Sequence, residues 1–177
     1  ELQYYTGAPT NSLIDNGKLI IKAIKETYNG KEYTSARLRT KDKGDWLYGR
    51  IEVSAKVPAG RGTWPAIWML STDWSYGGWP ESGEIDIMEH VGYDPNVIHG
   101  SIHTKAYNHT IGTQKTATMN IPTATTAFHK YAIEWFSDHI DFYIDQYKYF
   151  TFNNENSGWQ KWPFDKRFHL ILNLAVG

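Results

Sequence analysis

Three carboxylates stand close together in the segment Ser82–His90, whose sequence is SGEIDIMEH. Glu84 and Asp86 alternate with isoleucines, which is the period of a strand, so both side chains are expected on one face. Glu89 breaks this parity, and in a regular strand its charge would be buried among the isoleucines at a cost of several kcal/mol. A β-bulge at Ile87-Met88 would reset the alternation. The sequence therefore predicts Glu84, Asp86 and Glu89 in one row.

A row of like charges is costly, because neighbouring carboxylates raise one another's pKa, and catalysis gives a reason to build it. Glycoside hydrolysis needs one carboxylate that attacks or activates water and one carboxylic acid that protonates the leaving oxygen; retaining enzymes hold the pair about 5–5.5 Å apart. The Cα atoms of Glu84 and Glu89 are expected roughly 13 Å apart, so both side chains must lean inward over Asp86. Asp86 would then hydrogen-bond one carboxyl and hold the shared proton. The alternative is a solvated acidic face on an edge strand.

Neighbouring segments carry side chains that suit a sugar site. Trp64 and Trp68 fall on one face of an expected strand, where solvent-facing indoles make sense only with something to stack on them. The alternative places both rings in the core. In the strand 168–174, one face is apolar and the other presents His169 and Asn173, as expected for the floor of a polar cleft. Asn173 is equally compatible with a hydrogen-bonded bulge.

The elements that must position these residues follow a period of two. Alternation predicts strands over 18–24, 35–40, 50–57, 64–70, 84–91, 97–103, 131–136, 140–144, 147–152 and 168–175. Turn-forming glycine and asparagine pairs separate them. Only Thr123–Phe128 is expected to hold a helical turn, and Asn108-His109-Thr110 is expected to be an ordinary polar loop. An all-β fold of two antiparallel sheets packed face to face, a sandwich or jelly roll, is predicted.

Length and composition narrow the class of protein. The 177 residues predict a single domain spanning 1–177. The net charge of −1, with acidic and basic residues mixed, gives no field for nucleic acid or an anionic membrane. No cysteine is present, which excludes disulfides and a thiol nucleophile. Aromatic residues make up 15%, more than a core alone needs, which favours a neutral sugar substrate.

The carboxylate motif has a recognisable setting. Gly83–Glu89, preceded by Trp64–Leu70 and Trp79-Pro80, resembles family 16 of the glycoside hydrolases, and within it the laminarinase, or endo-1,3-β-glucanase, branch. Met88 matches the bulged version of the family's motif, whereas relatives that act on mixed-linkage glucan mostly lack this residue. The resemblance covers nearly the whole chain, including the segments 1–6, 35–38, 128–131, 134–135 and 172–177.

This resemblance implies a concanavalin A-like β-jelly roll with a substrate cleft on its concave sheet and a retaining double displacement. Glu84 matches the nucleophile, Glu89 the general acid/base and Asp86 the assisting carboxylate. Trp64, Trp68 and Trp79 match aromatics that stack on sugars near the cut bond. His103 and Arg39 match polar groups of the cleft, although a hydrogen-bonded histidine and a surface arginine are the ordinary alternatives.

The resemblance also predicts how the chain relates to its surroundings. The N- and C-terminal strands of the family are expected to lie outside this chain, which predicts a fragment, an engineered rearrangement or one piece of a split protein. The chain is expected to be a monomer, or else to be completed by a missing complementary segment. No cofactor is expected for catalysis. A structural calcium is possible in the full family fold, with ligands outside this chain, and no metal is expected among the site residues. A β-glucan is the expected partner, and a secreted location is expected because the family degrades polysaccharides.

Two other functions stay open on the sequence. The same chemistry could act on mixed-linkage β-1,3-1,4-glucan or on a galactan. A non-catalytic carbohydrate-binding module on the same scaffold belongs to a different class, since a fold does not fix a function. The three intact carboxylates argue against the binding module.

Overall fold

The computed structural model describes all residues 1–177, and nearly every regular element in it is a strand. The largest sheet has the strand order β12-β11-β10-β9-β16-β6, and β7 pairs with the start of β16. Neighbouring strands run antiparallel throughout this sheet. Its strands are β6 (Arg37–Arg39), β7 (Asp45–Trp46), β9 (Thr63–Ser71), β10 (Glu84–His90), β11 (Val97–His103), β12 (Lys115–Asn120) and β16 (Phe168–Val176).

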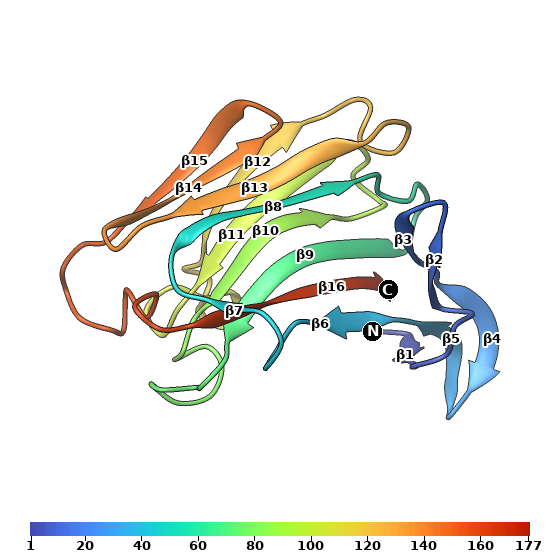
Figure 1. Cartoon of the computed structure of the whole chain (residues 1–177), viewed down its shortest axis with the longest axis horizontal. Coiled ribbons are helices and arrows are strands. Elements are labelled where there is room, and N and C mark those ends of the chain that lie inside the picture. The colour runs from blue at the N-terminus through green and yellow to red at the C-terminus, as the bar shows by residue number, and fades with distance from the viewer.

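A second antiparallel sheet packs against the first and forms the other layer of the sandwich (Figure 1). Its strand order is β15-β14-β13-β8, with β8 at one edge. Its strands are β8 (Gly49–Ala55), β13 (His129–Trp135), β14 (His139–Ile144) and β15 (Tyr147–Asn153). Two antiparallel sheets packed face to face confirm the predicted all-β sandwich.

Apolar side chains from the inner faces of both sheets form one core. In β10 the inner residues are Ile85, Ile87 and Met88, and all three are essentially inaccessible to solvent. Ile133, Trp135 and Phe142 face them from the smaller sheet, while Phe164 and Phe168 close the core near the loops. Because alternate residues of a strand point to opposite faces, this burial sends Glu84, Asp86 and Glu89 to the outer face, while His90 at the end of β10 is buried.

The first 35 residues form two small sheets, and the strand bounds predicted from the sequence were wrong in this region. β1 (Gln3–Tyr5) pairs in parallel with β5 (Lys31–Ser35), which pairs with β4 (Ile24–Tyr28), while β2 (Ser12–Asp15) and β3 (Lys18–Ile21) form a hairpin. The strand predicted over 18–24 is thus divided, with β3 ending before β4 begins. The strand predicted over 35–40 is likewise divided between β5 and β6. Figure 1 shows both termini beside these small sheets, and the Leu2 N–H donates to the Val176 carbonyl.

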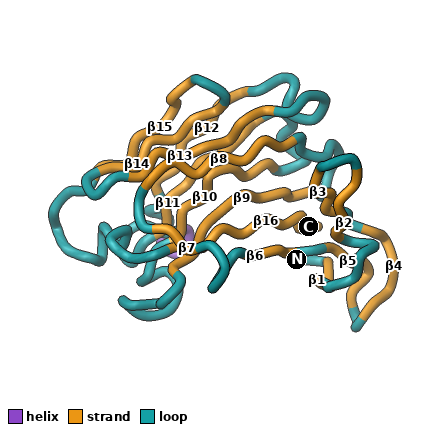
Figure 2. Tube along the Cα trace, viewed as in Figure 1, coloured by secondary structure: helices purple, strands orange, loops and turns teal.

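Long loops gather at the opposite end of the sandwich, where the short helix also lies (Figure 2). This helix is the 3₁₀ element η1 (His109–Ile111), and the Asn108 side chain caps it by accepting from the Thr110 N–H. The predicted helical turn at 123–128 consists of successive turns with one helical bond, from the Ala127 N–H to the Thr123 carbonyl. No helix is long and apolar enough to cross a membrane.

Candidate active site

A β-bulge in β10 places the three acids on one side of the larger sheet. Glu84 pairs with Leu70 of β9 and Asp86 with Trp68, but Glu89 pairs with Ala66, so the register shifts between Asp86 and Met88. The same shift occurs against β11. The predicted bulge is confirmed, and Glu89 is spared burial in the core. We call the outer surface that carries Glu84, Asp86 and Glu89 the acidic face.

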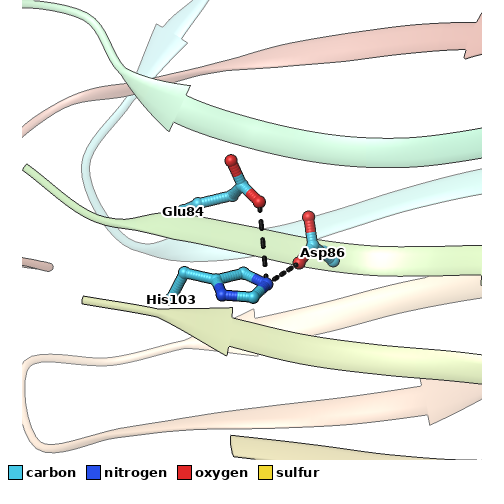
Figure 3. Close-up of side chains that lie close together, drawn as sticks. All are labelled: Glu84, Asp86 and His103. Atoms are coloured by element: carbon cyan, nitrogen blue, oxygen red, sulfur yellow. Dashed lines mark ion pairs between the residues drawn. The ribbon is translucent and has the colours of Figure 1, made fainter. Parts of the chain in front are cut away.

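His103 lies between two of these carboxyl groups (Figure 3). Its Nε2 atom is 3.2 Å from Asp86 Oδ2 and 3.8 Å from Glu84 Oε1. The ring comes from β11, where His103 pairs in register with Glu84, and it is only 6% exposed. Burial lowers the pKa of His103, so the ring is neutral at neutral pH. The neutral ring therefore contacts both carboxyl groups through Nε2 without adding a full positive charge between them.

The Glu84 and Asp86 carboxyl groups retain protons that exposed acids would lose. Burial raises the pKa of Glu84 to about 9, and the negative charge of Asp86 adds to the effect. Asp86 is 3% exposed, and burial followed by the charge of Glu89 raises its pKa well above the usual range. The two groups titrate together, so the pair still holds a proton at neutral pH.

Two indole N–H groups orient the two glutamates. Trp64 Nε1 donates to Glu89 Oε1 at 2.9 Å, and Trp79 Nε1 donates to Glu84 Oε2 at 3.0 Å. Trp64 is 42% exposed, which leaves its ring accessible as a stacking surface. Two of the three tryptophans predicted from the sequence thus contact the carboxylates, and each fixes one glutamate through a hydrogen bond.

Trp68 has a different environment. Its Nε1 donates to Asn173 Oδ1 at 2.7 Å, and Asn173 Nδ2 donates in turn to the Tyr5 hydroxyl at 3.0 Å. The guanidinium of Arg37 lies 4.5 Å from the centre of the Trp68 ring. Arg37 therefore covers one face of the indole, and a sugar cannot stack on that face. Asn173 is held as a bridge, so the structure brings both predicted residues together.

His109 is a neighbour of the site that the sequence did not reveal. Its ring centre lies 4.9 Å from that of Trp79 and 5.2 Å from that of His103. The short helix η1, capped by Asn108, brings it there across the loop end of the sandwich. The segment 108–110 was expected to be an ordinary polar loop. Only the tertiary contact reveals that His109 backs the tryptophan that holds Glu84.

Arg39 is on the same face of the sheet but lies away from the carboxylates. It pairs with Ile171 of β16, which pairs with Trp68, which pairs with Asp86. Three strand spacings separate Arg39 from Asp86, or about 14 Å. With His169 it lines a pocket of about 390 Å³, whose other lining residues are Tyr5, Arg37, Lys41, Leu70, Trp74 and Ile171.

One group of side chains has the composition of a metal site. Ligand atoms of Glu84, Asp86 and His103 all lie within 4.8 Å of one another. Two carboxylates and one imidazole can ligate a divalent cation, but a metal requires the carboxyl groups to be deprotonated. Burial raises the pKa of Glu84, so a cation would have to displace a proton in order to bind here. The arrangement is better suited to proton transfer.

Comparisons with known proteins agree with this geometry. The chain is 55% identical to a β-glucanase from Rhodothermus marinus, with 100% of the chain aligned and 65% of the length of that protein spanned. Among solved structures, the laminarinase from Rhodothermus marinus superposes with a TM-score of 0.98 at 54% identity, covering 100% of this chain and 74% of the other. A mutant of SCLam, a non-specific endo-β-1,3(4)-glucanase, superposes with a TM-score of 0.97 at 46% identity. The match covers 100% of this chain and 71% of that chain.

The model of one protein family matches nearly the full length of the chain. It covers residues 3–177, from β1 to the end of β16, and therefore includes the bulged strand, the three carboxylates and the tryptophans around them. The sandwich and the outer face of its larger sheet are thus features of one family fold. The chain belongs to family 16 of the glycosyl hydrolases.

Proposed function

We propose that the protein hydrolyses internal β-1,3-glucosidic bonds of laminarin-type glucans with retention of configuration. The observation that carries the proposal is the pair Glu84 and Glu89 on one face, one on each side of Asp86, each held by an indole N–H. Similarity to a laminarinase and a β-glucanase supports the substrate class. Neutral sugars also suit a face with exposed aromatic rings.

In the first step Glu84 attacks the anomeric carbon while Glu89 protonates the leaving oxygen. Glu84 must react as a carboxylate, so the proton held by the coupled pair has to lie on Asp86. Protonated Asp86 then serves as a hydrogen-bond donor to the carboxyl group of Glu84, and Trp79 Nε1 is a second donor to it. His103 Nε2 lies 3.8 Å from Glu84 Oε1 and packs against the pair. Together they set the charge and orientation of the nucleophile.

In the second step Glu89 acts as a base. Having given its proton to the leaving oxygen, it accepts one from a water molecule, which attacks the glycosyl-enzyme ester and frees Glu84. The Trp64 N–H holds the Glu89 carboxyl group in place during this step through its bond to Oε1. One glutamate therefore carries out both proton transfers.

The alternatives differ in substrate or in class. Mixed-linkage glucan is a second candidate because a similar structure is that of a non-specific endo-β-1,3(4)-glucanase. Met88 and its bulge favour laminarin as the preferred substrate. A non-catalytic binding module would gain nothing from a coupled Glu84–Asp86 pair that keeps a proton at neutral pH.

We also propose that the protein acts outside the cell, because polymeric glucans do not cross membranes.

The test is an assay of new reducing ends on laminarin, with barley mixed-linkage glucan and agarose as controls. The wild-type protein should release ends from laminarin fastest, and a Glu84→Ser variant should release none above background. Proton NMR of the first product should show the β-anomer, as retention requires. No release from any glucan, or an α-anomer as the first product, contradicts the proposal.

A further inference from the structure

Three cationic side chains line the pocket at the β6 edge of the larger sheet, away from the catalytic carboxylates. Arg37, Arg39 and Lys41 occupy alternate positions, so all three side chains reach the same face. Pairing of β6 with β16 continues past Arg39 through a bond from the Thr40 N–H to the Leu170 carbonyl, which keeps Lys41 in phase. Figure 1 shows β6 at the border of the sheet, beside β16.

No carboxylate neutralises these three cations. None of them lies within 4.0 Å of an acidic side chain, whereas Arg50 pairs with two acidic side chains and Arg167 with one. Asp45, on β7, is paired in register with His169. Its two carboxylate oxygens already accept hydrogen bonds from the Thr72 hydroxyl and the Asp42 N–H. Asp45 and Glu1 are the carboxylates whose charges act on lining residues, His169 and Tyr5 respectively, so the three cations leave the pocket with a net positive charge.

A buried polar group of the pocket also lacks a partner. His169 is 3% exposed, and its Nδ1 makes no hydrogen bond within the protein. Burial lowers the pKa of His169, and the charge of Asp45 raises it. The positive charges of Lys41, Arg39 and Arg37 lower the pKa further, because all three cations lie near the ring. His169 thus adds a neutral, buried ring to the wall of the pocket, beside the cations.

The remaining walls suit a sugar ring. Tyr5 and Trp74 are aromatic, and Ile171 and Leu70 provide an apolar floor. Burial raises the pKa of Tyr5 to about 12, so its phenol keeps the proton and can donate it. The volume of about 390 Å³ is within the range of small-ligand sites. An aromatic and apolar wall facing a group of cations fits a pyranose that carries a negative charge.

We propose that this pocket binds an anionic group, a carboxylate or a sulfate, on a glucan unit some distance from the bond that is cut. Arg39 and Lys41 supply the charge, Arg39 in the geometry that matches a planar or tetrahedral oxyanion. The three strand spacings between Arg39 and Asp86 put the anion on a different sugar from the one that reacts. The pocket then lets the enzyme prefer acidic or sulfated stretches of a β-glucan. This inference rests on the proposed function for the identity of the polymer.

The experiment compares three probes: laminarin, laminarin sparsely oxidised at C6 to glucuronate, and sparsely sulfated laminarin. Binding is measured by calorimetry on a Glu84→Gln background, so that turnover does not interfere, and kcat/KM is measured on the active protein. The variants are Arg39→Gln and Lys41→Gln. Lys43→Gln is the matched control, since Lys43 is exposed on the same segment and does not line the pocket.

The wild-type protein should bind at least one anionic probe about tenfold more tightly than laminarin, and salt should reduce the difference. Arg39→Gln and Lys41→Gln should each reduce the anionic-to-neutral ratio, and Lys43→Gln should leave it unchanged. Preference for glucuronate or for sulfate identifies the anion. Equal binding of all three probes by the wild type, or a ratio that neither pocket variant changes, overturns the inference. Loss of hydrolysis on every glucan with retained anion preference would instead contradict the proposed function alone.

Discussion

The indole N–H of Trp79 donates to Oε2 of Glu84 across 3.0 Å, so a side chain from the loop before β10 directly contacts the proposed nucleophile. His109 and His103 flank the same indole. The bond favours the ionised form of Glu84 against the burial that disfavours it. Trp79 thus has two separable properties, a donor and an aromatic surface.

Replacing Trp79 with Phe should separate the effect of the hydrogen-bond donor from that of the aromatic surface. Phe keeps a ring but lacks the donor, so the pKa of Glu84 should rise further and the acid limb of the kcat/KM profile should move to higher pH. We expect kcat at neutral pH to fall about tenfold, the size of one hydrogen bond to a charged group. A pH–rate series measures both effects. Trp159→Phe is the control, because Trp159 stacks on Tyr76 instead; an unchanged acid limb in Trp79→Phe would contradict the role given to the donor.

Deleting Met88 should remove the bulge but leave Glu89 on the acidic face and the protein active. The remaining residues Glu84-Ile85-Asp86-Ile87-Glu89 alternate regularly, so Glu89 still points to the same side as Glu84 and Asp86. We expect a lower midpoint of thermal unfolding, because a buried side chain is lost, and a shift of activity from laminarin toward mixed-linkage glucan. Met88→Leu keeps the residue count and the buried volume, and should cost less than about 1.5 kcal/mol without changing the substrate preference. Reducing-end assays on both glucans measure the preference, and an unchanged preference in the deletion variant would contradict the role given to the bulge.

Glu84→Gln should stabilise the protein increasingly as the pH rises. In the folded state the Glu84–Asp86 pair keeps one proton well above neutral pH, because burial raises the pKa of Glu84 to about 9, whereas the unfolded chain releases the proton of Glu84 near pH 4.5. Between these values the unfolded state binds fewer protons, so the free energy of unfolding of the wild type falls with rising pH, by up to about 1.4 kcal/mol per pH unit. Glutamine carries no titrating proton, so the variant should not lose this free energy of unfolding. Urea titrations at pH 5, 7 and 9 measure the free energy of unfolding of both proteins. A difference between variant and wild type that stays constant with pH would refute the raised pKa of Glu84.

Gly83→Ala should destabilise the protein and disturb Glu84. Gly83 has φ of 85°, and an added Cβ would lie 2.7 Å from Pro163 and 2.9 Å from Phe164. The left-handed conformation alone costs roughly 1–2 kcal/mol for a residue with a side chain. Gly78→Ala is the matched control from the same loop, with open space around its Cβ and an ordinary φ. Thermal unfolding and kcat of both variants provide the comparison; equal midpoints would contradict the steric argument.

The sequence predicted the acidic row because strand alternation is a local property, and Glu89 violated it in a way that only a bulge repairs. The inner faces of the main strands were predictable for the same reason. Contacts set by tertiary packing were not: the parallel pairing of β1 with β5 joins segments about thirty residues apart, and nothing in η1 indicates that His109 meets Trp79. β12 was missed because its residues, KTATMN, are mostly small or polar. The contact of Arg37 with Trp68 depends on side-chain packing across two strands.

The hydrogen bonds from Trp64 to Glu89 and from Trp79 to Glu84 have an optical consequence. Indole emission depends on the charge and polarity around Nε1–H, and two of the protein's eight tryptophans donate directly to the carboxyl groups that change charge. Their fluorescence therefore reports protonation of the acids and the arrival of a sugar over Trp64 without an added label. Each of the two glutamates proposed to perform the reaction is therefore in direct contact with a natural fluorophore.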